Sequence, residues 1–112
     1  MVVMLLILKN NPMNNSFQDI INSEKPVLID FFATWCGPCQ MLGPVLTQVK
    51  DSLGERVSII KVDVDKNQEL AATQQVRGVP TMILFQNGQQ LWRQSGVLSK
   101  EEIIKVILDK TN

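Results

Sequence analysis

Two cysteines, the only two in the chain, stand three positions apart in Cys36-Gly37-Pro38-Cys39. The apolar run 27–32 ends just before them, and the apolar residues at 41–53 recur with the period of a helix. The pair therefore lies at a predicted strand-to-helix junction, where free backbone N–H groups and partial positive charge favour a thiolate. Because a thiolate is the species that attacks a disulfide, this position predicts thiol–disulfide exchange. We expect Cys36 at the surface, where it attacks, and Cys39 one turn into the helix and shielded from solvent, where it resolves.

Composition narrows the kinds of site that the chain can hold. Its 112 residues suit one domain with one core. Eleven basic residues balance eleven acidic ones, so no electrostatic reason favours nucleic acid or a membrane as a partner. There is no histidine, which excludes histidine-based catalysis and most metal sites. A purely structural disulfide is the poorer explanation of the cysteines, because so short a ring constrains the unfolded chain weakly.

The first residues are apolar but do not predict a membrane segment. Residues 1–8 are too short to span a bilayer, and they lack the basic region and cleavage site of a secretory signal. We predict residues 1–12 to be an N-terminal extension or an edge strand, with 2–8 pairing at the edge, and residues 13–112 to form the domain. The absence of an export signal and of further cysteines predicts a reducing, cytoplasmic location.

The remaining patterns predict alternating strands and helices in the order (β)αβαβαββα. Early strands joined by helices are expected to be parallel with right-handed crossovers, and the Asn87-Gly88 turn adds an antiparallel hairpin. The fold class is therefore α/β, with a mixed sheet between helices. The predicted strands are 27–32, 57–63, 82–85 and 90–95. The first predicted helix is capped by Asn15 or Ser16 and ends near Ile21, and the second begins at Pro38 and ends at Gly54. The third is capped by Asp65, with Gln68 at the reciprocal position of a capping box, and ends at Gly78, and the fourth begins at the capping box Ser99–Glu102 and ends near Leu108.

Two charged residues interrupt the predicted buried strands. Asp30 lies six residues before Cys36, and burial raises the pKa of a carboxyl group because desolvation disfavours its charged form. It is either a proton acceptor and donor for Cys39 or a carboxylate turned to solvent at a sheet edge. Lys61 interrupts the next strand, where it either pairs with Asp30, directly or through water, or extends out of the end of the sheet.

The motif Trp35-Cys36-Gly37-Pro38-Cys39 resembles the active-site signature of the thioredoxin family, and the resemblance covers roughly residues 16 to 110. It implies the thioredoxin fold, a mixed central β-sheet of four or five strands flanked by helices on both faces. It also implies a protein-disulfide reductase that uses its own Cys36–Cys39 disulfide and no other cofactor. The implied partners are disulfide-containing client proteins and a thioredoxin reductase, and a monomer is expected.

The same resemblance implies further site residues. Asp30 and Lys61 match the buried aspartate of the family and the lysine near it. From the sequence alone the Val79–Pro80 bond would be trans, but the resemblance implies a cis bond packed against the dithiol. The implied client-docking surface is flat and uncharged, formed by Trp35, Gly37, Pro38, Val79, Pro80, Gly96 and Val97. The chain departs from the family pattern at Phe32, often tryptophan, and at Gln40, often lysine, which removes a positive charge near the thiolate.

Three other functions are alternatives to a protein-disulfide reductase. The cysteines could form half of a zinc site, but without histidine a closed site would need a second chain. The fold could serve as a binding module without redox turnover. The protein could be an oxidase or isomerase, whose members commonly place a histidine between the cysteines; this chain has none, which favours a reductant.

Overall fold

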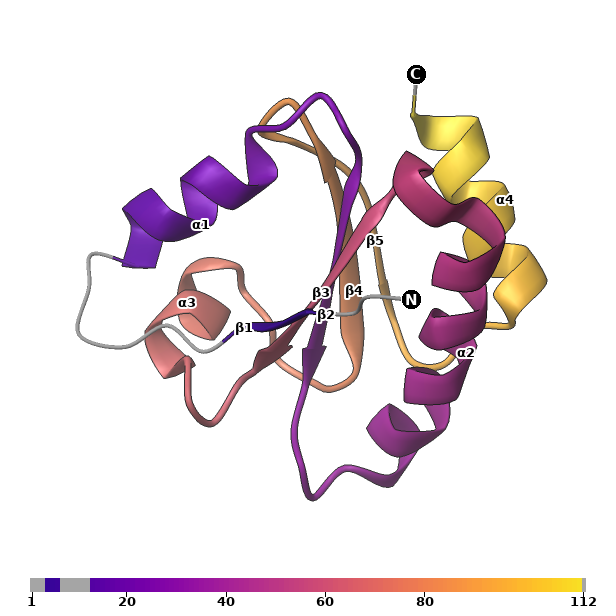
Figure 1. Cartoon of the computed structure of the whole chain (residues 1–112). Helices are drawn as coiled ribbons and strands as arrows, with labels where there is room; N and C mark the ends of the chain where they lie inside the picture. Colours follow the sequence, from indigo (N-terminus) through magenta and orange to yellow (C-terminus); the bar gives the residue numbers. More distant parts are fainter. Residues whose placement is uncertain (1–3, 7–12, 112) are drawn as a thin grey trace.

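The computed structural model describes residues 4–6 and 13–111, which form a five-stranded sheet with helices on both faces (Figure 1). The strand order is β1-β3-β2-β4-β5. β1 and β2 run parallel to β3, whereas β4 is antiparallel to β2 and β5 to β4, so the predicted mixed sheet is confirmed. The strands are β1 (Met4–Leu6), β2 (Val27–Phe32), β3 (Ser58–Asp63), β4 (Thr81–Gln86) and β5 (Gln89–Ser95).

The helices form two layers, with α1 and α3 on one face of the sheet and α2 and α4 on the other (Figure 1). A short 3-10 helix, η1, follows α2 directly. No helix of the described residues is long and apolar enough to cross a membrane. The helices are α1 (Met13–Ile21), α2 (Gly37–Leu53), η1 (Gly54–Arg56), α3 (Gln68–Thr73) and α4 (Lys100–Lys110).

Strand β2 lies at the centre of the core and is buried on both faces. Val27, Ile29 and Phe31 pack with residues of α1 and α3. Leu28 packs on the opposite face with residues of α2 and α4. Successive side chains of a strand point to opposite faces, so the uninterrupted apolar run reflects two covered faces. Asp30 follows Leu28 by two positions and therefore lies on the face that α2 covers.

Several local predictions are confirmed. Gly54 follows the end of α2 with a φ of 55°, and its N–H bonds to the carbonyl of Lys50. Asn87 and Gly88 have φ values of 53° and 80°, as a two-residue hairpin of primed type requires. Ser99 and Glu102 form both hydrogen bonds of the capping box at the start of α4.

Three expected helix boundaries are wrong. α1 begins at Met13, ahead of the expected caps Asn15 and Ser16, because three consecutive polar residues left the sequence signal ambiguous. α3 begins at Gln68 and not directly after Asp65. The Asp63 carboxylate accepts the N–H groups of residues 65 and 66 and so forms a turn there. α3 also ends at Thr73, well before Gly78.

The N-terminal prediction is met only in part by described residues. Met4–Leu6 form an edge strand that pairs in parallel with β3. Residues 2, 3, 7 and 8 of the expected strand lie outside the described residues. The boundary between residues 12 and 13 stays a prediction.

Candidate functional site

Cys36 and Cys39 form a disulfide at the start of α2. Cys36 is the N-cap residue of this helix, and its Sγ accepts a hydrogen bond from the backbone N–H of Cys39 at 3.2 Å. Pro38 lies in the first turn, where the N–H that it lacks would have no partner within the helix. The two sulfurs are therefore not equivalent, because one lies at the positive end of the helix and the other within its first turn.

The expected difference in exposure between the cysteines is wrong for the disulfide form. Cys36 was expected at the surface, but it is 4% exposed and Cys39 is 3% exposed. Both pack in one small apolar cluster with Ala33, against which Phe32 and Val79 also pack. Their disulfide holds both sulfurs in this cluster, so the difference between them lies in the hydrogen bond to the helix N-terminus.

The segment before β4 reaches the disulfide through its backbone. The Val79–Pro80 peptide bond is cis, as the resemblance implied. The carbonyl oxygen of Val79 lies 3.7 Å from Sγ of Cys36. In the disulfide this is a contact only, because Sγ has no proton to donate. Gly96, with a φ of 93°, donates its N–H to the carbonyl of Pro80 at 2.9 Å and so places the end of β5 beside the cis-proline.

Trp35 stands at the edge of the site with 70% of its surface exposed. Its indole Nε1 donates to Oδ2 of Asp65 at 2.8 Å, a hydrogen bond that ties it to the turn after β3. A pocket of about 150 Å³ opens beside it, lined by Trp35, Val64, Val76, Arg77, Gly78 and Val79. Sequence patterns predict no site role for four of these residues, nor for Asp65, for which they predict a helix cap. For Val64 the sequence offered one signal, its position. Val64 directly follows β3, which runs parallel to β2.

Three other predicted docking residues lie on the surface of the molecule. Gly37 and Pro38 are exposed in the first turn of α2. Val97 is 39% exposed and directly follows Gly96. The structure thus brings Trp35, Val79 and the cysteines together around one apolar surface, with Gly37, Pro38 and Val97 at neighbouring chain positions.

Asp30 is fully buried, which excludes the solvent-exposed sheet edge as its location. Neither carboxylate oxygen has a hydrogen-bond partner among the described residues. Burial raises the pKa of Asp30 from its ordinary 3.8 to about 7, and the positive charge of Lys61 opposes that rise. A pKa near neutrality suits a group that both takes and gives a proton at physiological pH.

Lys61 is the register neighbour of Asp30 across β2 and β3. A direct ion pair does not form, since the Asp30 carboxylate is unpartnered among the described residues. Nζ of Lys61 instead lies 4.7 Å from the ring centroid of Phe32, a distance at which a cation is attracted by the face of an aromatic ring. Lys61 is half-buried, which leaves its charge within electrostatic reach of Asp30.

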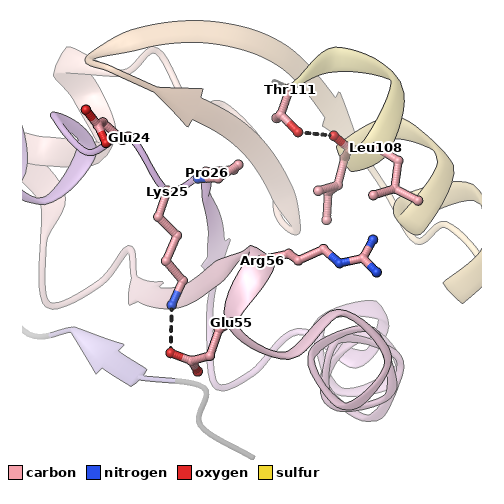
Figure 2. A pocket seen from close by; sticks show the side chains of 8 residues that line it. Glu24, Lys25, Pro26, Glu55, Arg56, Leu108 and Thr111 are labelled. Carbon is pink, nitrogen blue, oxygen red and sulfur yellow. Dashed lines mark hydrogen bonds and ion pairs between the residues drawn. The ribbon is translucent and has the colours of Figure 1, made fainter.

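A larger pocket has a volume of about 500 Å³. Figure 2 shows the residues that line it. It is bounded by η1, the end of α4 and the residues before β2, and Lys25 pairs with Glu55 at 3.4 Å on one side of it. α2 has 17 residues and separates η1 from Cys36, a length of about 25 Å. Pocket volume therefore does not mark the redox site, which is identified by the cysteine geometry.

The part of the chain that the structure describes offers no cluster of side chains suited to bind a metal ion. Residues 4–6 and 13–111 contain no group of three or more candidate metal ligands. A zinc site built on Cys36 and Cys39 would thus need ligands from elsewhere.

Comparisons with known proteins agree with this geometry. A family model described as Thioredoxin matches residues 9–109. The chain is 45% identical over 93 residues to a "Bifunctional thioredoxin reductase/thioredoxin" of Mycobacterium leprae, covering 83% of this chain and 20% of that protein. It is 42% identical over 94 residues to "Thioredoxin Y, chloroplastic" of Oryza sativa subsp. japonica, covering 83% and 56%. The chain thus spans between a fifth and just over half of the length of these relatives.

Among solved structures, the chain is similar to the thioredoxin Mala s 13 of Malassezia sympodialis. The TM-score is 0.83 at 32% sequence identity, and the match covers 99% of this chain and 92% of that one. A likeness over nearly the whole of both chains extends the sequence match to the arrangement of sheet and helices.

Proposed function

This chain belongs to the thioredoxin family, and from that premise we propose that it is a thiol–disulfide oxidoreductase that reduces disulfides in client proteins. One observation carries the proposal. Sγ of Cys36 accepts an N–H group at the N-terminus of α2 while it is bonded to Cys39. In the reduced protein the same N–H would stabilise a Cys36 thiolate, the nucleophile of disulfide exchange.

Exchange proceeds in two displacements. The Cys36 thiolate attacks one sulfur of the client disulfide, and a mixed disulfide forms as the other client sulfur leaves as a thiolate. Cys39 loses its proton and attacks Sγ of Cys36, which releases the second client sulfur and closes the Cys36–Cys39 disulfide. Two electrons pass from the dithiol to the client. Because the cysteine pair supplies both electrons, the reaction needs no other cofactor.

Asp30 is the proposed acceptor for the Cys39 proton. It lies on the face of β2 beneath α2, where the buried stripe of the helix begins with Cys39 and Leu42. Burial raises its pKa to about 7, so it is partly ionised at neutral pH and can exchange protons in either direction. Lys61 is proposed to keep part of Asp30 ionised by opposing the effect of burial.

Client proteins are proposed to dock on the surface around the disulfide. The contact between the Val79 carbonyl and Cys36 supports backbone pairing of an extended client segment at Val79. Trp35, Gly37, Pro38, Gly96 and Val97 would supply apolar contact around it. Backbone pairing and apolar contact depend little on the client sequence, which fits a broad range of clients.

The proposed physiological setting follows from the chemistry and the relatives. A protein that reduces clients must itself be reduced again. One relative is a "Bifunctional thioredoxin reductase/thioredoxin", which supports a thioredoxin reductase as partner. The relatives include bacterial and chloroplastic proteins. The absence of cysteines beyond the active pair supports a reducing cytoplasm as its location. The protein is proposed to act as a monomer.

Insulin reduction tests the proposal. With dithiothreitol as electron donor, the wild-type protein should accelerate insulin reduction, whereas Cys36→Ser should be inactive. In a separate reaction, Cys39→Ser that has been reduced and freed of dithiothreitol should accumulate a mixed disulfide with the client, because attack survives and resolution fails. A wild-type protein without activity would leave only a binding module, and a mildly oxidising midpoint potential against glutathione would indicate an oxidase or isomerase instead.

A further inference from the structure

Arg93, in the edge strand β5, contacts the end of a helix that lies far from it in the sequence. Its Nη1 donates to the carbonyl of Gln74 at 2.6 Å, and its Nη2 donates to the carbonyl of Gln75 at 2.6 Å. These two carbonyls end α3 and open the segment that leads through Val79 to Pro80. We propose that Arg93 is a positioning residue for client docking, because it fixes the segment from Gln74 to Pro80. This inference rests on the proposed function.

The end of α3 needs an external partner. The helix has six residues, and none of them is basic in its last turn. Gln75 adopts a φ of 57°, a left-handed conformation that a side chain with a Cβ disfavours. The last carbonyls of a helix carry its partial negative charge, and a guanidinium group offers two parallel N–H donors that can bind adjacent oxygens. Arg93 therefore both neutralises this helix end and holds the turn at Gln75.

The held segment is the one that meets the disulfide. Val76 and Val79 line the pocket beside Trp35, and the carbonyl of Val79 lies 3.7 Å from Sγ of Cys36. A shift at Gln75 would move both of these residues, since Val76 directly follows Gln75 and Val79 belongs to the same short segment. Arg93 thus acts on client docking through this segment rather than by touching the client.

β5 also holds the other end of the segment. The hydroxyl of Thr81 donates to the carbonyl of Gly78 at 2.7 Å and lies 2.9 Å from the hydroxyl of Ser95. The N–H of Gly96 donates to the carbonyl of Pro80 at 2.9 Å. The segment is therefore held at both ends by one strand, and Arg93 is the only charged side chain among these contacts. Its removal should release the first end and leave the second in place.

Hydrogen exchange tests, without any client, whether Arg93 holds the segment from Gln74 to Pro80. The N–H of Gln75 bonds to the carbonyl of Ala72, and that of Val76 bonds to the carbonyl of Ala71. In Arg93→Gln these two amides should exchange about tenfold faster, with Arg93→Lys in between because an ammonium group cannot match both carbonyls as a fork. Arg56→Gln, which removes the same charge at the remote pocket, should leave both amides unchanged.

Kinetics test the link to docking. For insulin, Arg93→Gln should raise KM by about three- to tenfold with kcat unchanged, because client binding weakens while the reacting sulfurs stay in place. The midpoint potential and the reduction rate of a small aromatic disulfide should match the wild type. A merely stabilising role would lower the unfolding temperature without moving KM.

Each outcome decides a separate question. Unchanged exchange at Gln75 and Val76, or the same KM rise in Arg56→Gln, would overturn the inference. Failure of the wild type to reduce insulin would overturn the proposed function and with it the docking role of Arg93, whereas the exchange experiment would still show whether Arg93 holds the segment. If Arg93→Gln did not fold, Arg93→Lys would decide both measurements.

Discussion

Asp30 combines complete burial with a titratable group, and this couples folding stability to pH. Burial raises the pKa of Asp30 from 3.8 to about 7, so between these values the folded protein binds a proton that the unfolded chain has lost. The stabilisation is therefore fully present below about pH 4 and is lost as the pH rises through about 7. At 1.36 kcal/mol for each unit, the full effect is about 4 kcal/mol.

We expect Asp30→Asn to remove this dependence. Between pH 4 and pH 8, the free energy of unfolding of the variant should rise relative to wild type by up to about 4 kcal/mol. Urea unfolding of the disulfide form at several pH values measures it, and comparing the change with pH cancels any constant cost of the buried amide. A difference that stays flat across this range would show that Asp30 titrates normally.

Lys61 should set the pH at which the site works. Its positive charge lowers the pKa of Asp30 against the effect of burial. In Lys61→Met that pKa should rise, so less carboxylate is present at pH 7 and insulin reduction should slow there by about twofold and recover at higher pH. Lys61→Arg, which keeps the charge, is the control. An unshifted pH profile in Lys61→Met would remove Lys61 from the mechanism.

Among the single residues of the site, local sequence indicated the candidate residues better than it predicted their contacts. Cys36, Cys39 and Asp30 could be singled out as candidates because thiols at a helix start and a carboxylate in an apolar run are unusual in themselves. The bond between Trp35 and Asp65 could not, since it joins residues 30 positions apart. The equal burial of the two cysteines was missed because it depends on Val79, which the sequence places far away.

At the scale of elements, the proposed docking surface includes two glycines with different backbone conformations, Gly37 and Gly96. A Cβ at Gly37 or at Gly96 would meet no atom within 4 Å, so neither glycine is required for space. Of these two glycines only Gly96 has a positive φ, of 93°. Gly96→Ala should therefore lower the free energy of unfolding by about 1 kcal/mol and weaken client binding, because Pro80 loses a well-placed partner.

Gly37→Ala is the matched control for that change. Gly37 is helical in the first turn of α2, where alanine is favoured over glycine, so stability should be equal or slightly higher. Urea unfolding of both variants and insulin KM measure the contrast. Equal loss of stability in the two variants would show that backbone conformation at Gly96 is not the cause.

The elements themselves were largely predictable, and their failures share one cause. Strands and long helices follow from periodicity, which is why β2, α2 and α4 lie where they were expected. The region 65–78 did not follow, because side chains elsewhere decide it. The Asp63 carboxylate delays the start of α3, and the Arg93 guanidinium, 18 to 19 positions away, stabilises its early end. Gly78 looked like the natural break only because neither contact is visible in local sequence.

At the scale of the whole molecule, charge is balanced and the proposed docking surface is mostly apolar. The chain carries equal numbers of acidic and basic residues, and among the residues that the structure describes Arg77 is the one charged residue lining the pocket beside Trp35. Long-range attraction should therefore contribute little to client encounter, since steering requires an excess of one sign of charge. Specificity then depends on contacts made after encounter, at Val79 and the pocket.

Salt dependence tests this balance. Between about 0.02 and 0.3 M sodium chloride, the screening length falls severalfold, yet KM for insulin should change by less than about twofold. Arg77→Gln should behave like the wild type in this titration, because a single exposed cation adds little once screened. A KM that rises steeply with salt in the wild type but not in Arg77→Gln would show instead that this arginine binds an acidic group of the client. In that case docking would depend on charge at one point of a surface that is otherwise apolar.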